Sequence, residues 1–229
     1  MPELFEMDLK NNAAEECQKA LAGNRPLPLD IRNKASQNAL MIACANGALE
    51  VIEMLFAMSG THDLEAVDAE GWTALHHASK QGSKEILTIL FEKGANLSAT
   101  TNSNATCLHL AAQERHKGAI DFLLEKKCPL DIQTTSPNKW DGGKTALHLA
   151  LSKYEKYNKD DQKDQINEIG EEISLSLLQH GADVKLKDKT GQSALHLAAE
   201  SGMSKAVEKL IQLGADVNSK DSKFELILF

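Results

Sequence analysis

Thr73-Ala74-Leu75-His76 is the stretch that decides the fold, because similar quartets return along the chain. The other copies are Thr106-Cys107-Leu108-His109, Thr145-Ala146-Leu147-His148 and Ser193-Ala194-Leu195-His196, with a weaker one at Asn38-Ala39-Leu40-Met41. The leucines of successive copies lie 35, 33, 39 and 48 residues apart. Self-similarity at a spacing of about 33 residues indicates a repeat architecture, in which each unit is one supersecondary element stacked on its neighbours.

Each unit is predicted to be a pair of short helices. The residue that opens each quartet is threonine, serine or asparagine, whose side chain caps the exposed N–H groups of a helix start. Small or apolar residues at i, i+3 and i+4, as at Leu75, Ala78 and Ser79, then form a narrow stripe on one helix face. Gly82 ends that helix, and apolar pairs at 86–87 and 90–91 predict a second one.

A second recurring motif lies at the end of three of the units. Its copies are Gly94-Ala95-Asn96-Leu97, Gly181-Ala182-Asp183-Val184 and Gly214-Ala215-Asp216-Val217. Together the two motifs resemble those of ankyrin repeats, over roughly residues 30–221. The resemblance implies an all-α solenoid of stacked helix pairs, with short β-hairpin or loop fingers between successive pairs.

The resemblance divides the chain into three parts. Residues 1–29 are expected to form a degenerate N-terminal capping helix pair. Five repeats are expected within residues 30–220, at about 34–66, 67–99, 100–138, 139–186 and 187–220. Residues 221–229 are either the stub of a sixth repeat or a C-terminal cap, because the end face of a solenoid needs a polar cover.

Two insertions interrupt the repeat, one near residues 133–138, before the fourth unit, and one near 155–170, between the helices of that unit. The second is rich in charged and amide side chains, so it is expected to be a solvated helix extension or loop, or else a second contact surface. Three residues also replace glycine at turns: Lys127 after a second helix, and Arg115 and Tyr154 between the helices of a pair. Since a side chain disfavours the left-handed backbone, we expect strain at these turns.

Composition excludes several classes of protein. The chain has 229 residues and a net charge of −8, which argues against non-specific binding to nucleic acid. The four cysteines lie far apart, without the paired spacing of a zinc site or the density of a disulfide scaffold. No apolar run reaches the roughly 18 residues of a membrane helix. We expect a monomer that binds neither nucleic acid nor membranes and that resides in the cytoplasm, or in the host cytoplasm if the chain is a secreted bacterial effector.

No set of residues predicts catalysis. His76, His109, His148 and His196 share one repeat position, which spreads them along an axis instead of gathering them at a site. The resemblance implies that they hydrogen-bond to the backbone of a neighbouring finger. The stretch Gly142-Gly143-Lys144-Thr145 resembles the end of a phosphate-binding loop, but it lacks the first glycine and the preceding strand. We therefore expect no enzymatic activity, no metal and no cofactor.

The remaining candidates are surface positions that the repeat does not dictate. In ankyrin-like units the fingers and the exposed end of the first helix line a concave groove. Here these positions hold eight basic residues against four acidic ones, a difference of +4 in a chain of net charge −8. Including Asp68 and Asp188, which the family pattern makes structural, leaves +2. The basic residues are Arg32, Lys34, Lys80, Lys139, Lys144, Lys153, Lys187 and Lys189, and the acidic ones are Glu70, Glu114, Asp141 and Glu200.

The expected function is therefore protein binding. A groove of this charge is predicted to receive a polar, locally acidic protein segment. Trp72 and Trp140, the two tryptophans of the chain, fall on fingers, where they are either binding hot spots or packed against their own finger. The predicted partner-binding residues are Trp72, Lys80, Gln81, Gln113, Lys139, Trp140, Lys144, Lys153, Lys187, Lys189 and Gln192. The alternative hypothesis is the targeting or substrate-recruiting arm of a longer enzyme or bacterial effector, with its catalytic domain outside this chain.

Overall fold

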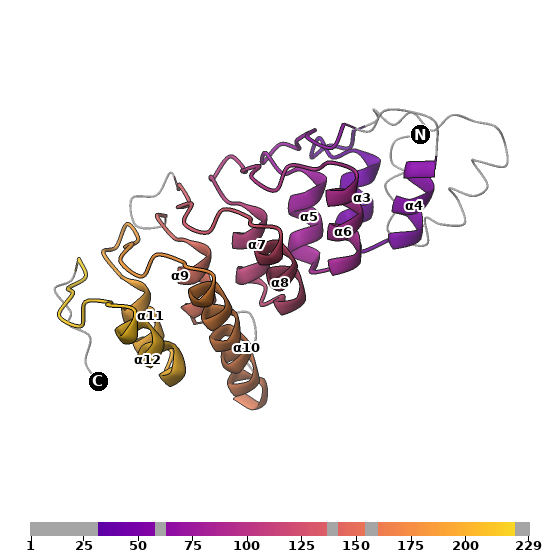
Figure 1. The fold of residues 1–229 in the computed structure, drawn as a ribbon. Helices are drawn as coiled ribbons and strands as arrows, with labels where there is room; N and C mark the ends of the chain where they lie inside the picture. The colour runs from indigo at the N-terminus through magenta and orange to yellow at the C-terminus, as the bar shows by residue number, and fades with distance from the viewer. Residues whose placement is uncertain (1–31, 58–62, 137–141, 154–159, 223–229) are drawn as a thin grey trace. The chain divides into compact units, whose positions relative to one another are not determined.

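Helices and loops make up the structure, a computed structural model that describes residues 32–57, 63–136, 142–153 and 160–222. The chain divides into two compact units, Met1–Asn102 (unit 1) and Ser103–Phe229 (unit 2). The predicted N-terminal cap at 1–29 lies outside the described residues, and so does the predicted stub or cap beyond residue 222. Unit 1 contains α3 (Ala39–Ala45), α4 (Leu49–Ala57), α5 (Ala74–Gln81) and α6 (Lys84–Glu92). Unit 2 contains α7 (Cys107–Gln113), α8 (Lys117–Glu125), α9 (Ala146–Leu151), α10 (Asp160–Gln179), α11 (Ala194–Glu200) and α12 (Ser204–Gln212) (Figure 1).

The first helix of each pair begins where the sequence predicts. Thr73 illustrates the arrangement: its Oγ1 accepts from the His76 backbone N–H, and its own backbone N–H donates to His76 Nδ1 at 3.1 Å. This reciprocal contact satisfies two groups that a helix start otherwise leaves without partners. The predicted N-caps are confirmed, and each has an extended backbone: Asn38, Thr73, Thr106, Thr145 and Ser193.

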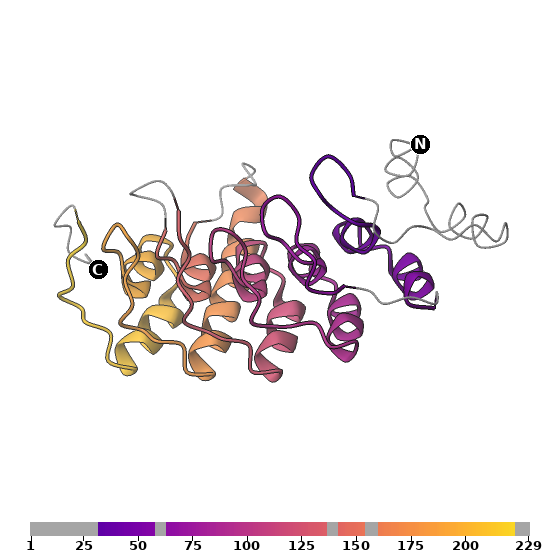
Figure 2. The ribbon, with the colours of Figure 1, turned by 90° about the horizontal axis from the view of Figure 1, so that it is seen from above.

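Helices of the same kind pack side by side within each unit. In unit 2 the first helices α7, α9 and α11 are neighbours in one layer, and α8, α10 and α12 are neighbours in a second layer (Figure 2). In unit 1, α3 packs on α5 and α4 on α6. The quartet leucines lie in the core of their own unit, where burying one contributes about 1.5–3 kcal/mol. All five are buried: Leu40, Leu75, Leu108, Leu147 and Leu195.

The loop before each first helix forms a finger held by its own hydrogen bonds. In the finger of α5, the Asp68 backbone N–H donates to the Trp72 carbonyl at 3.0 Å. The finger of α11 repeats this contact from Asp188 to Gln192 at 2.9 Å. Neighbouring fingers of one unit are joined by single backbone hydrogen bonds, such as Lys189 N–H to Gly142 O at 3.0 Å. Among the described residues the fingers contain only one isolated β-bridge, Lys187 with Ser193, so they are loops in place of full hairpins.

The first insertion lengthens the finger of α9. In the finger of α5, the residue whose N–H donates to the Asp68 side chain is Trp72, four positions later. In the finger of α9, the equivalent donor to the Thr134 side chain is Lys144, ten positions later. Gly143 N–H bonds the Thr134 carbonyl at 2.7 Å, as Gly71 bonds Asp68. The extra residues therefore lie between Thr134 and Gly143, a range that overlaps the predicted insertion near 133–138.

The second insertion extends a helix. α10 has 20 residues, whereas α8 and α12 have 9 each, and its first part is formed by residues 160–170 of the predicted insertion. The expectation of left-handed turns is confirmed at Arg115 (φ 63°) and Lys127 (φ 58°), whereas Tyr154 lies outside the described residues. Even α10, the longest helix of the described residues, is too polar to cross a membrane, and none of the others qualifies.

Candidate protein-binding surface

The predicted partner-binding residues are distributed over both units. Unit 1 contributes Trp72 from a finger and Lys80 and Gln81 from the end of α5. Trp72 is half-buried, whereas Lys80 and Gln81 are exposed. Two predicted residues, Lys139 and Trp140, lie outside the described residues. The remainder belong to unit 2: Gln113, Lys144, Lys153, Lys187, Lys189 and Gln192.

In unit 1 the structure brings Trp72 and Lys80 together. The Lys80 Nζ stands 5.0 Å from the centroid of the Trp72 ring, within the range of a cation–π interaction. On α5 the His77 ring lies 5.2 Å from the same indole, tilted by 46°. Trp72 therefore packs against α5, the first helix of its own repeat. This contact supports the alternative that the tryptophan is a local packing residue. The residue is only half-buried, so it still forms part of the surface.

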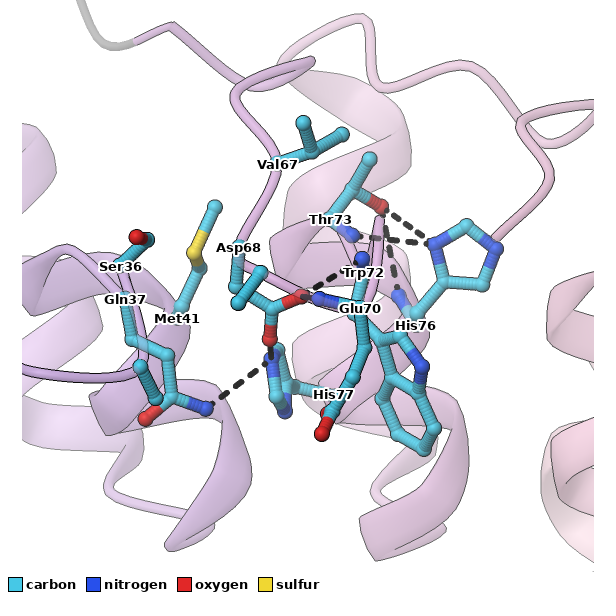
Figure 3. Close-up of polar contacts among 12 residues, drawn as sticks. Ser36, Gln37, Met41, Val67, Asp68, Glu70, Trp72, Thr73, His76 and His77 are labelled. Carbon is cyan, nitrogen blue, oxygen red and sulfur yellow. Dashed lines mark hydrogen bonds and ion pairs between the residues drawn. The ribbon is translucent and has the colours of Figure 1, made fainter. Parts of the chain in front are cut away.

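The Asp68 carboxylate connects the finger to α5 by hydrogen bonds to both. Asp68, Trp72, His77 and Lys80 are called the His77 cluster below. The Asp68 Oδ1 accepts hydrogen bonds from the backbone N–H groups of Glu70 (3.0 Å) and Trp72 (2.8 Å). Its Oδ2 accepts from His77 Nε2 at 3.0 Å, and both side chains are buried (Figure 3). The amide nitrogen of Gln37, from the preceding finger, lies 3.4 Å from the same ring nitrogen. The structural role that the family pattern assigns to Asp68 is confirmed.

Sequence reasoning did not single out His77. The signal that could have found it is its repeat position, because the corresponding residues are all aliphatic: Ile42, Leu110, Leu149 and Leu197. Burial lowers the pKa of His77 below 6.5, since desolvation disfavours the imidazolium. The hydrogen bond to Asp68 and the charges of Asp68 and Glu70 raise this pKa in part, and the charge of Lys80 lowers it further. His77 is therefore neutral at pH 7 and donates to the Asp68 carboxylate.

In unit 2 the basic residues are spread along the fingers and first helices. Lys187 Nζ donates to the Lys220 carbonyl at 3.1 Å, and Lys189 Nζ donates to the Ser136 carbonyl at 3.2 Å. These contacts use one of the three donors of each ammonium, and both side chains are exposed. Lys153 instead pairs with Glu200 at 3.0 Å, an exposed ion pair that neutralises much of its charge. Lys187 and Lys189 are thus two exposed cations on the finger of α11, and carbonyls of two different loops hold their ammonium groups.

The quartet histidines have the structural contacts that the resemblance implies at two of the four positions. The Nε2–H of His76 donates to the Ala99 carbonyl, and that of His109 to the Lys144 carbonyl, each at 3.1 Å. Within the described residues, Nε2 of His148 and of His196 is buried without a hydrogen-bond partner. The described residues also contain no group of three histidine, cysteine, aspartate or glutamate side chains placed to hold a metal ion.

Comparison with known proteins agrees with this architecture. A family model described as ankyrin repeats (3 copies) matches residues 8–101 and 168–221, and a model of ankyrin repeats (many copies) matches residues 80–124. Among solved structures, the human ASB11 ankyrin repeat domain has a TM-score of 0.75 at 19% identity, over 97% of this chain and 89% of that one. The ankyrin repeat domain of Bcl-3, described as a unique member of the IkappaB protein family, has a TM-score of 0.66 at 24% identity, over 97% and 91% of the two chains.

Curated proteins with similar sequences are much longer than this chain. The transient receptor potential cation channel subfamily A member 1 of Drosophila melanogaster is 26% identical over 76% of this chain, and the match spans 14% of that protein. The B-cell lymphoma 3 protein homolog of Mus musculus is 27% identical over 87% of this chain and 33% of that protein. The predicted all-α solenoid class is confirmed by the helix pairs and by these likenesses. Because the first family model alone covers more than half of its residues, this chain belongs to the ankyrin-repeat family.

Proposed function

We propose that this chain is a non-enzymatic, monomeric, cytoplasmic binding module that takes a polar, locally acidic protein segment along the finger side of its repeats. Ankyrin repeats are generally protein–protein interaction modules, and the family membership supports this class of function. The observation that carries the finer proposal is a set of exposed cations: Lys80 beside Trp72 in unit 1, and Lys187 and Lys189 on the finger of α11 in unit 2. A chain of net charge −8 otherwise repels an acidic ligand.

The cations of each unit have a feature suited to binding. In unit 1, Trp72 supplies a rigid aromatic surface of the kind enriched in hot spots, and Lys80 places a positive charge beside it. In unit 2, backbone carbonyls orient the ammonium groups of Lys187 and Lys189 while leaving donors for a carboxylate. The cytoplasmic location is supported by Cys44, Cys107 and Cys128, which are buried cysteines that form no disulfide.

The decisive experiment measures binding to a purified partner identified by affinity capture. The triple variant K80E/K144E/K187E reverses charge on the proposed surface. The matched control K84E/K126E/K205E makes the same change in net charge at exposed lysines within or directly after the second helices α6, α8 and α12. We expect the first variant to bind about tenfold or more weakly at low salt and the control to bind nearly as well as the wild type.

Four outcomes would contradict the proposal or one of its parts. Equal weakening by both triple variants would mean that diffuse charge, and no particular surface, governs binding. Unchanged affinity in a folded Trp72→Ala variant would remove the tryptophan from the contact. Turnover of a substrate by the purified chain would overturn the non-enzymatic assignment, and a catalytic domain in the same open reading frame would favour the recruiting arm of a longer enzyme.

A further inference from the structure

His77 is a titratable residue surrounded by charged, polar and aromatic groups from two fingers and α5. Its imidazole faces the buried carboxylate of Asp68 on one side and the Trp72 indole on another (Figure 3). The Lys80 ammonium stands over the same indole. The finger thus supplies Asp68, Glu70 and Trp72, α5 supplies His77 and Lys80, and the preceding finger supplies the neutral Gln37 amide. The packed helix α3 faces the His77 cluster with neutral Met41.

We infer that His77 is a positioning residue for the binding surface of unit 1, and that its protonation displaces Lys80 from the face of Trp72. This inference rests on the proposed function for its biological meaning, because Trp72 and Lys80 are the proposed partner contacts. The cluster itself is a property of the unliganded chain, so it can be tested without a partner.

The direction of the change follows from charge and mobility. Protonated His77 places a second cation beside the indole that already carries Lys80. His77 and Asp68 are buried and hydrogen-bonded, whereas Lys80 is exposed on a flexible stem. The repulsion is therefore relieved by movement of Lys80, since it costs less to move an exposed side chain than a buried one. The indole face that Lys80 covers at neutral pH then becomes open to solvent or to a ligand.

The charges around His77 predict the effect of each substitution. Lys80 lowers the pKa of His77 by its charge, but a K80Q variant also lacks the cation whose movement is measured, so it serves as the reference for an uncovered indole. Asp68 raises that pKa by its hydrogen bond and its charge, so D68N moves the transition of His77 to lower pH. Glu70 acts in the same direction as Asp68 through its charge alone, and E70Q gives a smaller shift of the same sign.

The experiment reads the exposure of Trp72 with acrylamide, a neutral quencher whose approach does not depend on local charge. A W140F background leaves Trp72 as the single tryptophan. Fluorescence quenching is measured from about pH 7.5 to about pH 5, the range in which histidine titrates, and only where far-UV circular dichroism is unchanged. In this background we expect quenching to increase as pH falls, with a midpoint below 6.5.

Variants separate positioning from a purely structural role. H77Q keeps an amide donor for Asp68 but cannot titrate, so its quenching stays at the level seen near neutral pH. K80Q leaves the indole uncovered, so its quenching is high throughout. The matched control H180Q removes an exposed histidine of unit 2 and keeps the pH response. A flat profile in the W140F background, or an unchanged rise in H77Q, would overturn the inference without bearing on partner binding. Conversely, loss of the proposed function would leave this pH response in place.

Discussion

The guanidinium of Arg115 lies against the backbone of Gly170, so closely that a Cβ added at Gly170 would stand 3.0 Å from Arg115 Cζ. Arg115 Nη1 donates to the Leu149 carbonyl at 2.8 Å, and Nη2 donates to the Ser152 carbonyl at 2.6 Å. One side chain from the turn between α7 and α8 therefore satisfies carbonyls at the end of the six-residue helix α9. Gly170 is the residue of α10 that leaves room for it.

Gly170→Ala is expected to destabilise the protein. The new Cβ would meet the Ala150 carbonyl at 2.9 Å as well as Arg115, and overpacking of this kind costs about 1–3 kcal/mol. Higher helix propensity returns at most about 1 kcal/mol. The matched control is Gly118→Ala in α8, where nothing lies within 4 Å of the added Cβ, so stability should rise. Urea unfolding of both variants measures the difference, and a change of the same sign in both would contradict the close approach.

Arg115 and Lys127, two of the four described non-glycine residues with a left-handed backbone, should respond oppositely to substitution by glycine. Lys127→Gly removes strain at φ 58° from an exposed side chain, so we expect a gain of up to about 1 kcal/mol. Arg115→Gly removes similar strain at φ 63° but loses the hydrogen bonds to α9, each worth about 1–3 kcal/mol. We expect a net loss of stability there. Thermal melts of the two variants give the answer, and a stabilised Arg115→Gly protein would show that the guanidinium contacts contribute little.

Glu171 should act as a cap in trans for α12. Its Oε1 accepts hydrogen bonds from the backbone N–H groups of Lys205 (2.7 Å) and Ala206 (3.2 Å), at the start of that helix. Because the N-cap residue Met203 makes no side-chain cap, Glu171→Ala is expected to cost about 1–2 kcal/mol. The neighbouring exposed residue provides the control, since Glu172→Ala should change stability by less than about 0.5 kcal/mol. Equal effects in chemical unfolding would rule out the capping role.

Stability should fall as the solution is acidified below neutrality. Burial lowers the pKa values of His77, His109 and His148 from 6.5, and for each it is the largest influence. Between the unfolded and folded pKa values the unfolded chain binds more protons, so its free energy drops relative to the folded state. The stabilising contribution is complete above 6.5 and is lost as pH falls through the lower folded values. Urea midpoints measured across this range should decrease as the pH is lowered, and they should decrease less steeply in H109Q. A midpoint that rises as the pH is lowered would refute the prediction.

Local features of the fold could be predicted because their causes lie close together in sequence. Asn38 and Thr73 each cap the helix that begins at the next residue. Leu75 is buried because it lies on the apolar face of its helix. The lysines at 187 and 189 could likewise be assigned to the finger surface from their repeat positions. Their hydrogen bonds to Lys220 and Ser136 could not, since each partner is more than 30 residues away.

The repeat period and the capping residues alone thus determined that this is a chain of helix pairs, because helix starts and apolar stripes are encoded within a few residues. Only the tertiary structure decided how Arg115 and Gly170 accommodate the long α10, and that Asp68 joins His77 to Trp72 in one cluster. Those contacts depend on how neighbouring helices and fingers approach one another. Repeat spacing assigns residues to a helix or a finger, but the side-chain packing between those elements selects which of them touch.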